Sequence, residues 1–227
     1  MEQLPLLISI AFILTTVFTI LLFWKSAGYS SVTIIVLAAW LLLQAIVSLN
    51  GFYKVTDTVP PRFPLLVIPP LLLIMILFVS KPGRRYLDRM DATMLTLLHV
   101  IRIPVEFILW WVFLHKAVPQ LMTFEGRNFD IFAGITAPFV CYFGLIKQKL
   151  GRQFLLWWNI ICIGLLLNIV INAVLSAPTP FQQFAFDQPN IALLYFPFVW
   201  LPSCIVPLVL LSHLVVIRQL VKAGKRA

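Results

Sequence analysis

The chain has 227 residues, of which 61% are hydrophobic and only 11% are charged, and its formal net charge is +9. Its mean hydropathy is +1.00. A soluble domain of this size needs more charge to cover its surface, so the composition excludes an ordinary soluble protein. The apolar residues lie in long uninterrupted blocks, whereas the strands of a membrane β-barrel alternate apolar and polar residues, so a barrel is excluded as well.

Seven apolar blocks are each close to the roughly 20 residues that a helix needs to cross a hydrocarbon core of about 30 Å. Helices satisfy their own backbone hydrogen bonds, which hydrocarbon cannot do for them. The sequence therefore predicts an all-α fold, a single domain over residues 1–227 built as a bundle of seven transmembrane helices. We expect these helices at residues 4–24, 32–53, 63–80, 92–114, 129–146, 154–175 and 191–217.

The first three predicted helices contain few polar groups. Block 4–24 is too long for the apolar region of a signal peptide and lacks a positive N-terminal flank, so we interpret it as an uncleaved span. The second helix carries Gln44 and Ser48 one turn apart. The third contains Pro69 and Pro70, which predict a kink because proline removes a backbone donor.

The fourth predicted helix contains the strongest functional signal, three ionisable residues at mid-depth. At 100° per residue, His99 and Glu106 lie almost in line, and Arg102 lies about 60° to one side of His99. A charge at this depth costs about 2.5–3.5 kcal/mol, so this stripe should face the bundle interior or a wet cavity. Arg102 and Glu106 are at positions i and i+4 and can form an ion pair, with Pro104 kinking the helix between them.

Later helices offer polar groups at a similar depth. Asn168 and Asn172 lie one turn apart on the sixth helix. Together with Gln44, Arg102 and Glu106, we expect them to line a cavity that opens outward. Prolines inside the fifth and seventh helices predict bends of the kind that open cavities in transporters and receptors: Pro138, Pro197, Pro202 and Pro207.

The distribution of basic residues predicts the orientation of the bundle. If the helices alternate in direction, one side holds Lys25, Lys81, Arg84, Arg85, Arg89, Lys147, Lys149, Arg152, Arg218, Lys222, Lys225 and Arg226, and the other side holds only Lys54, Arg62, Lys116 and Arg127. Short loops rich in Lys and Arg stay in the cytoplasm, so we expect the N-terminus outside and the C-terminus inside. The predicted location is the plasma (inner) membrane, crossed several times, with the basic side against anionic lipid headgroups. No aromatic platform accompanies these residues, so nucleic acid is not a predicted partner.

Metal and haem chemistry has two candidate residues. His99 and His213 both lie in the inner halves of their helices and can meet, which suits a bis-histidine haem or a metal completed by a carboxylate. His115 lies about 160° around the helix from His99 and cannot share that site. No complete ligand set can be counted, so no cofactor is predicted. The cysteines show neither ligand nor disulfide spacing: Cys141, Cys162 and Cys204.

These patterns leave three functions open. The first is a binding protein, for transport or sensing, in which Arg102 holds the anionic group of a small molecule or lipid headgroup and Glu106 titrates. The second is a membrane-embedded enzyme or electron carrier that uses His99 and Glu106, with a metal or haem. The third is a scaffold subunit of a membrane complex, in which the Arg102–Glu106 pair only fixes the helix against its neighbours.

Overall fold

The structure is a computed structural model that describes residues 4–56, 58 and 61–224. Every regular element in this part of the chain is a helix, so the all-helical prediction is confirmed. The α-helices are α1 (Leu6–Ser26), α2 (Ser31–Leu49), α3 (Pro64–Val79), α4 (Lys81–Arg89), α5 (Ala92–Leu98), α6 (Arg102–Leu114), α7 (Ile131–Val140), α8 (Arg152–Ser176) and α9 (Val206–Ala223). The 3₁₀ helices are η1 (Phe52–Lys54), η2 (His99–Ile101), η3 (Gln120–Met122) and η5 (Ala192–Leu194), and the π-helices are η4 (Cys141–Ile146) and η6 (Leu201–Ile205).

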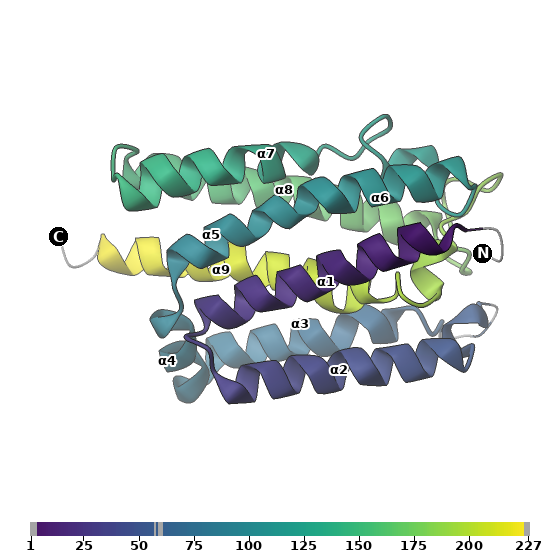
Figure 1. The fold of residues 1–227 in the computed structure, drawn as a ribbon, viewed down its shortest axis with the longest axis horizontal. Coiled ribbons are helices and arrows are strands. Elements are labelled where there is room, and N and C mark those ends of the chain that lie inside the picture. Colours follow the sequence, from purple (N-terminus) through teal and green to yellow (C-terminus); the bar gives the residue numbers. More distant parts are fainter. Residues whose placement is uncertain (1–3, 57, 59–60, 225–227) are drawn as a thin grey trace.

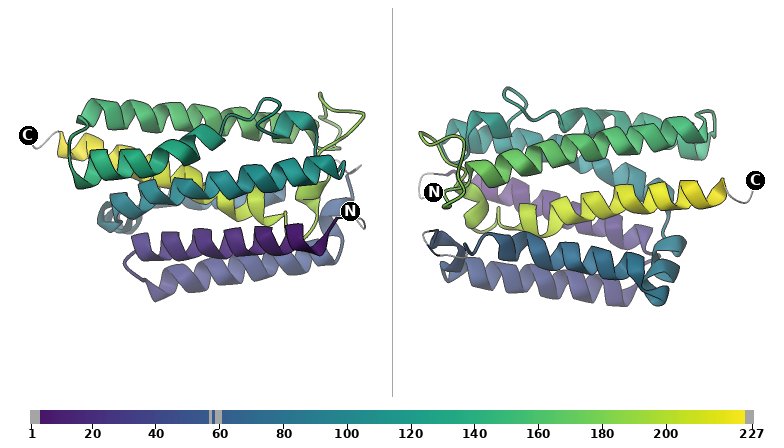
Figure 2. Two further views of the ribbon diagram at one scale, coloured as in Figure 1. Left: turned by 45° about the horizontal axis from the view of Figure 1, so that its top comes forward. Right: turned by 180° about the vertical axis from the view of Figure 1, so that it is seen from behind.

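The long helices lie side by side along one axis, and the start of α1 and the end of α9 lie at opposite ends of the bundle (Figure 1). Seen from behind, α9 runs between α8 and α3 (Figure 2). More than half of the span Leu201–Ala223 is buried, against less than a quarter of α2. The C-terminal helix is therefore the centre of the bundle, and α2 is at its periphery.

Five segments are long and apolar enough to cross a membrane: α1, α2, the segment Ala92–Leu114, α8 and the segment Leu201–Ala223. Helix α3 followed by α4 is a sixth if this pair, bent by 93°, counts as one span. The segment Ile131–Ile146, formed by α7 and η4, is apolar but shorter. This set of helices is compatible with a multi-pass membrane protein.

Irregular turns interrupt three of the helices that the sequence predicts, each close to a proline. Within 92–114, η2 separates α5 from α6 just before Pro104, and η4 follows Pro138. In the segment expected at 191–217, continuous helix begins only at Leu201 and runs to Ala223. Proline has no N–H to give to the carbonyl four residues earlier, so the regular hydrogen-bond ladder cannot continue through these positions.

Helix α4 occupies the segment expected to be a loop between the third and fourth helices. It starts after Ser80, whose Oγ accepts a hydrogen bond from the N–H of Gly83 at 3.1 Å. Near its end, Asp88 accepts hydrogen bonds from Arg218 Nε at 2.8 Å and from Lys222 Nζ at 2.6 Å. The capping serine separates α4 from α3, and the ion pairs attach it to the end of α9.

These ion pairs predict a pH-dependent contribution to stability. The hydrogen bond from Arg218 lowers the pKa of Asp88 below its ordinary value of 3.8. A lowered folded-state pKa means that the contribution is present above 3.8 and is lost as the pH falls through the folded-state value. We expect Asp88→Asn to reduce the unfolding free energy by about 0.5–1 kcal/mol at pH 7, and the difference from the parent to shrink below pH 3.8. Thermal unfolding in detergent measures both, with Asp187→Asn as the exposed control; an unchanged difference at low pH would contradict the assignment.

Candidate functional site

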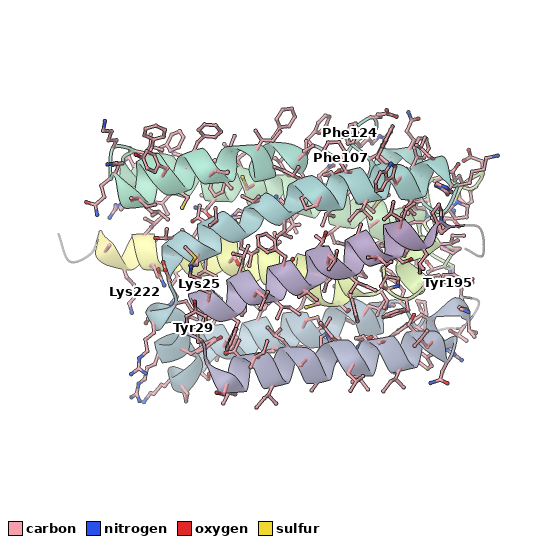
Figure 3. The ribbon with its side chains drawn as sticks, in the orientation of Figure 1. Lys25, Tyr29, Phe107, Phe124, Tyr195 and Lys222 are labelled. Carbon is pink, nitrogen blue, oxygen red and sulfur yellow. The ribbon has the colours of Figure 1, made fainter. Side chains whose placement is uncertain are left out.

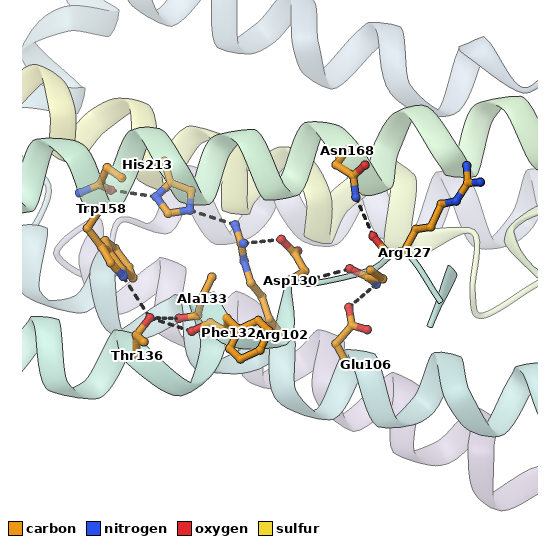
Figure 4. A network of polar contacts seen from close by, with 12 residues as sticks. Arg102, Glu106, Arg127, Asp130, Phe132, Ala133, Thr136, Trp158, Asn168 and His213 are labelled. Atoms are coloured by element: carbon orange, nitrogen blue, oxygen red, sulfur yellow. Dashed lines mark hydrogen bonds and ion pairs between the residues drawn. The ribbon is translucent and has the colours of Figure 1, made fainter. Parts of the chain in front are cut away.

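Arg102, the first residue of α6, is the centre of a buried polar network (Figure 4). Its Nη1 donates to Asp130 Oδ1 at 2.6 Å, and its Nη2 donates to His213 Nε2 at 2.9 Å. Because a guanidinium only donates, His213 Nε2 must accept, which assigns the ring proton to Nδ1. His213 Nδ1 then donates to Asn159 Oδ1 at 2.8 Å. One chain of hydrogen bonds thus links α6, α8, α9 and the start of α7.

Glu106, one turn further along α6, is held by a second arm of the network. Its Oε1 accepts a hydrogen bond from Asn128 Nδ2, and the same amide nitrogen donates to the carbonyl of Met122 at 3.1 Å. Asn128 Oδ1 accepts from the backbone N–H of Asp130 at 3.1 Å. Asn128 therefore fixes the position of Glu106 relative to the Arg102–Asp130 pair, although it belongs to the loop before α7.

The expected ion pair between Arg102 and Glu106 is absent from the described residues, where the partner of Arg102 is Asp130. Side chains on a helix lean toward its N-terminus, so Arg102 leans away from Glu106, which lies one turn toward the C-terminus. A basic residue placed N-terminal to its acidic partner is also the weaker order for such a pair. Among the described residues, Asp130 therefore balances the charge of Arg102.

A glycine on α7 allows Asp130 to reach Arg102. A Cβ atom added to Gly134 would lie 2.9 Å from Ile103 Cγ1 and 3.3 Å from Arg102 Cβ. Any larger residue would push α7 away from the start of α6. Asp130 directly precedes α7, one turn before Gly134, and therefore lies against Arg102 when the two helices are this close.

A cavity of about 70 Å³ lies beside the network. Its polar lining residues are Arg102, Glu106, Asn128 and Asp130, and its other lining residues are apolar and come mainly from α6, α8 and η6–α9. Two atoms in this lining group are buried without a hydrogen-bond partner in the described structure, Arg102 Nε and Glu106 Oε2. The cavity has room for a few water-sized groups, and the residues that carry the unused donor and the unused acceptor are both among those that line it.

His99 and His213 meet by stacking. Their ring centroids are 3.7 Å apart with an interplanar angle of 12°, and Trp158 packs 5.7 Å from each ring. Both ring nitrogens of His213 are engaged in hydrogen bonds, whereas both nitrogens of His99 lack a partner among the described residues. A metal or haem held by both rings would require His213 to free one of these nitrogens, and ligation through Nε2 would displace the hydrogen bond from Arg102. Within the described part of the chain, no three His, Cys, Asp or Glu residues are grouped to hold a metal ion.

Three residues that the sequence predicts for the cavity do not line it. Gln44 accepts a hydrogen bond from the hydroxyl of Tyr53 at 2.7 Å. Asn168 donates to the carbonyl of Arg127 at 2.7 Å, and Asn172 donates to the carbonyl of Asn168 at 2.9 Å. These amides join helices to loops or to their own helix, and only Arg102 and Glu106 of the predicted ligand-binding residues contact the cavity.

Sequence reasoning missed three members of the network, Asn128, Asp130 and Asn159. A signal existed for Asp130, since an acid at the start of the apolar segment 129–146 needs a partner inside the bundle. Asn128 and Asn159 carry no comparable signal, because an isolated amide is common in loops and in membrane helices.

These features define a multi-helix protein with apolar outer surfaces and a charged network in its interior. The chain belongs to the family described as Domain of unknown function (DUF8737), which matches residues 60–221. The matched stretch includes every residue of the network, and α1 and α2 precede it. No curated protein and no solved structure matches the chain.

The mutual dependence of Arg102 and Asp130 can be tested by removing one partner or both. We expect Asp130→Asn to lower the unfolding free energy by about 3–5 kcal/mol, because it leaves a buried guanidinium without its counter-charge. The double variant Arg102→Met, Asp130→Leu should lose less than this, since no uncompensated charge remains. Unfolding by sodium dodecyl sulfate in mixed micelles measures both; a loss in the double variant as large as that in Asp130→Asn, or larger, would argue against a coupled pair.

Proposed function

We propose that the chain crosses the inner membrane seven times, with its N-terminus outside and its C-terminus in the cytoplasm. The seven segments are α1, α2, α3, α5–α6, α7–η4, α8 and η6–α9. The opposite ends reached by the start of α1 and the end of α9 support an odd number of crossings (Figure 1). Lys25 and Lys222 lie at one end of the bundle and Tyr195 at the other, in line with the predicted sorting of basic residues (Figure 3). Of the basic residues assigned to the inner side, Lys225 and Arg226 lie outside the described residues.

Cysteine accessibility in intact cells tests this topology on the full chain. The native cysteines Cys141, Cys162 and Cys204 are all buried, so they give little background labelling. We expect a membrane-impermeant maleimide to label Asp187→Cys from outside, and to label Arg85→Cys only after the membrane is permeabilised. Labelling of both positions from one side would contradict seven crossings, and the reverse pattern would contradict the orientation.

We propose, further, that the protein binds a small polar ligand in the cavity between Arg102 and Glu106. The observation that carries this proposal is the pair of buried atoms without partners, Arg102 Nε and Glu106 Oε2, on residues that line one cavity. An unsatisfied buried donor or acceptor costs about 1–3 kcal/mol, and more when it is charged. A ligand that accepts from the guanidinium and donates to the carboxylate removes both costs.

Charge and size restrict the class of ligand. Arg102 carries one positive charge, whereas Asp130 and Glu106 carry two negative charges when both are ionised. A neutral molecule with both a donor and an acceptor suits this balance better than an anion does, and unlike a cation it can also accept from Arg102 Nε. A cavity of about 70 Å³ suits a group of a few heavy atoms rather than a lipid headgroup.

Transport is the form of binding that the surrounding backbone favours. The 3₁₀ turn η2 ends directly before Arg102, and the π-helix η6 contributes Leu201, Pro202 and Ile205 to the cavity lining. Transporters commonly place substrate sites at interrupted helices near the middle of the membrane, and π-helical turns frequently mark functional sites. The irregular turns on both sides of the cavity therefore favour transport over a fixed sensor site.

Infrared difference spectroscopy on the protein in lipid nanodiscs tests the binding proposal. Ammonium, formamide and formate serve as cationic, neutral and anionic probes. We expect formamide, which both donates and accepts, to shift the carboxyl bands of the parent protein, and ammonium and formate to leave them unchanged. In Glu106→Gln the shift should vanish at formamide concentrations that saturate the parent, because the loss of one hydrogen bond to a charged group lowers the affinity about 10- to 100-fold.

Glu125→Gln is the matched control, because this exposed loop carboxylate accepts a hydrogen bond from Trp110 and does not line the cavity. Its spectrum should keep the probe-dependent shift. Equal responses of the parent and Glu106→Gln, or a response to formate alone, would overturn the proposed site.

A further inference from the structure

A second and larger hollow lies on the opposite side of the C-terminal helix, away from the polar network. This crevice of about 390 Å³ is bounded by α2, α3 and η6–α9. Val36, Leu43 and Leu73 line it and keep 46–49% of their surface exposed, so the crevice opens sideways between α2 and α3. In a membrane, this opening faces the lipid tails.

The polar atoms around the crevice already have partners. Pro207 has no N–H to give to the carbonyl of Ser203, and Trp40 Nε1 donates to that carbonyl at 2.8 Å. The hydroxyl of Ser203 donates to the carbonyl of Val199, also at 2.8 Å. No side-chain atom found buried without a partner in the described residues belongs to the crevice lining. The surface therefore offers an occupant only apolar contact, which suits a hydrocarbon chain.

Helix α4 lies at the end of the bundle where α3 ends and α2 begins (Figure 1). Its Tyr86 hydroxyl lies 3.0 Å from Thr33 Oγ1 at the start of α2, and its Asp88 is bonded to Arg218 on α9. A Cβ atom added to Gly83 would lie 2.4 Å from the carbonyl oxygen of Leu77 on α3, so a glycine is needed for this sharp return. The helix is thus attached to all three walls of the crevice.

The outward charges of α4 are positive. Lys81 and Arg85 lie one turn apart, both are exposed, and neither forms an ion pair with a described residue. The acid of this helix, Asp88, is occupied by Arg218 and Lys222. A phosphate near the first turn of α4 would therefore meet basic groups and no competing acid from this helix.

We propose that α4 and the crevice together bind one anionic glycerophospholipid, with its phosphate beside Lys81 and Arg85 and one acyl chain in the crevice. The apolar lining, the sideways opening and the basic helix at one end supply the three parts of such a site. Only the leaflet, which is the cytoplasmic one, rests on the proposed topology; the site does not depend on the ligand cavity at Arg102.

Photo-crosslinking with the full chain in nanodiscs tests this proposal. Phosphatidylglycerol and phosphatidylcholine, each with the same diazirine-bearing acyl chain, are the probes, and peptide mass spectrometry locates the crosslinks. We expect crosslinks on α2 and α3 at residues lining the crevice, in excess for phosphatidylglycerol. The double variant Lys81→Gln, Arg85→Gln should lose this excess by about fivefold for each basic side chain.

Two matched controls make the outcome decisive. Lys147→Gln with Lys149→Gln removes the same charge from the same side of the bundle and should keep the excess. Ala39→Phe fills the crevice from an exposed position and should reduce crosslinking of both lipids there, whereas Ala38→Phe, which does not line the crevice, should not.

Equal losses of the excess in the Lys81, Arg85 variant and in the Lys147, Lys149 variant would overturn the site. Crosslinks spread evenly over the outer helices would do the same, because both results indicate only a general attraction of anionic lipid. Thermal unfolding of each variant verifies that it is folded. The infrared response of Glu106 should persist in Ala39→Phe, so failure of the lipid site and failure of the ligand cavity are separate results.

Discussion

The ion pair between Arg102 and Asp130 is the interaction on which the interior of this protein depends. Burying a guanidinium is costly unless it is paired and its remaining donors are satisfied. Arg102 is 2% exposed, and its partners come from the start of α7 and from α9. The two bonds hold three helices at fixed relative positions, and the small residue Gly134 permits the approach that makes the shorter bond possible.

The irregular backbone of the central helices is consistent with this interior. Helices within a bilayer lose regular hydrogen bonds only where protein or a cavity compensates for them. The break at η2 precedes Arg102 directly, and the break at η6 borders the same cavity. Where Pro207 removes a donor near the other face of α9, the indole of Trp40 takes its place at the Ser203 carbonyl. The interruptions at η2 and η6 therefore lie next to groups that use them.

The sequence was sufficient for the helical class and for the identity of the central charged residue, because both follow from local patterns. Long apolar blocks require helices, and an arginine inside one of them requires an internal partner. The partner was not predictable from spacing: Glu106 is the nearer acid in the sequence, but Asp130, 28 residues away, is the one in contact. That choice depends on how closely α7 packs on α6. Helix α4 was missed for a similar reason, since a nine-residue segment with five charged residues after a span resembles a loop until Ser80 and Asp88 are seen to fix it.

The two arms of the network, an inner arm through His213 and Asn159 and an outer arm through Asn128 and Glu106, differ in how completely their polar atoms are hydrogen-bonded. On the inner arm, both ring nitrogens of His213 have hydrogen-bond partners, and Asn159 Nδ2 donates to the carbonyl of Leu155. The ring of His99, which stacks on His213, does not line the cavity. On the outer arm, Glu106 keeps an unused oxygen beside a space that can admit a small group. Binding a proton or ligand there alters the charge next to the Arg102–Asp130 pair without breaking any bond of the inner arm. Occupancy of the proposed site would act on the packing of α6 and α7 through Asn128, which donates to the Glu106 carboxylate and accepts from the backbone N–H of Asp130, the residue directly before α7.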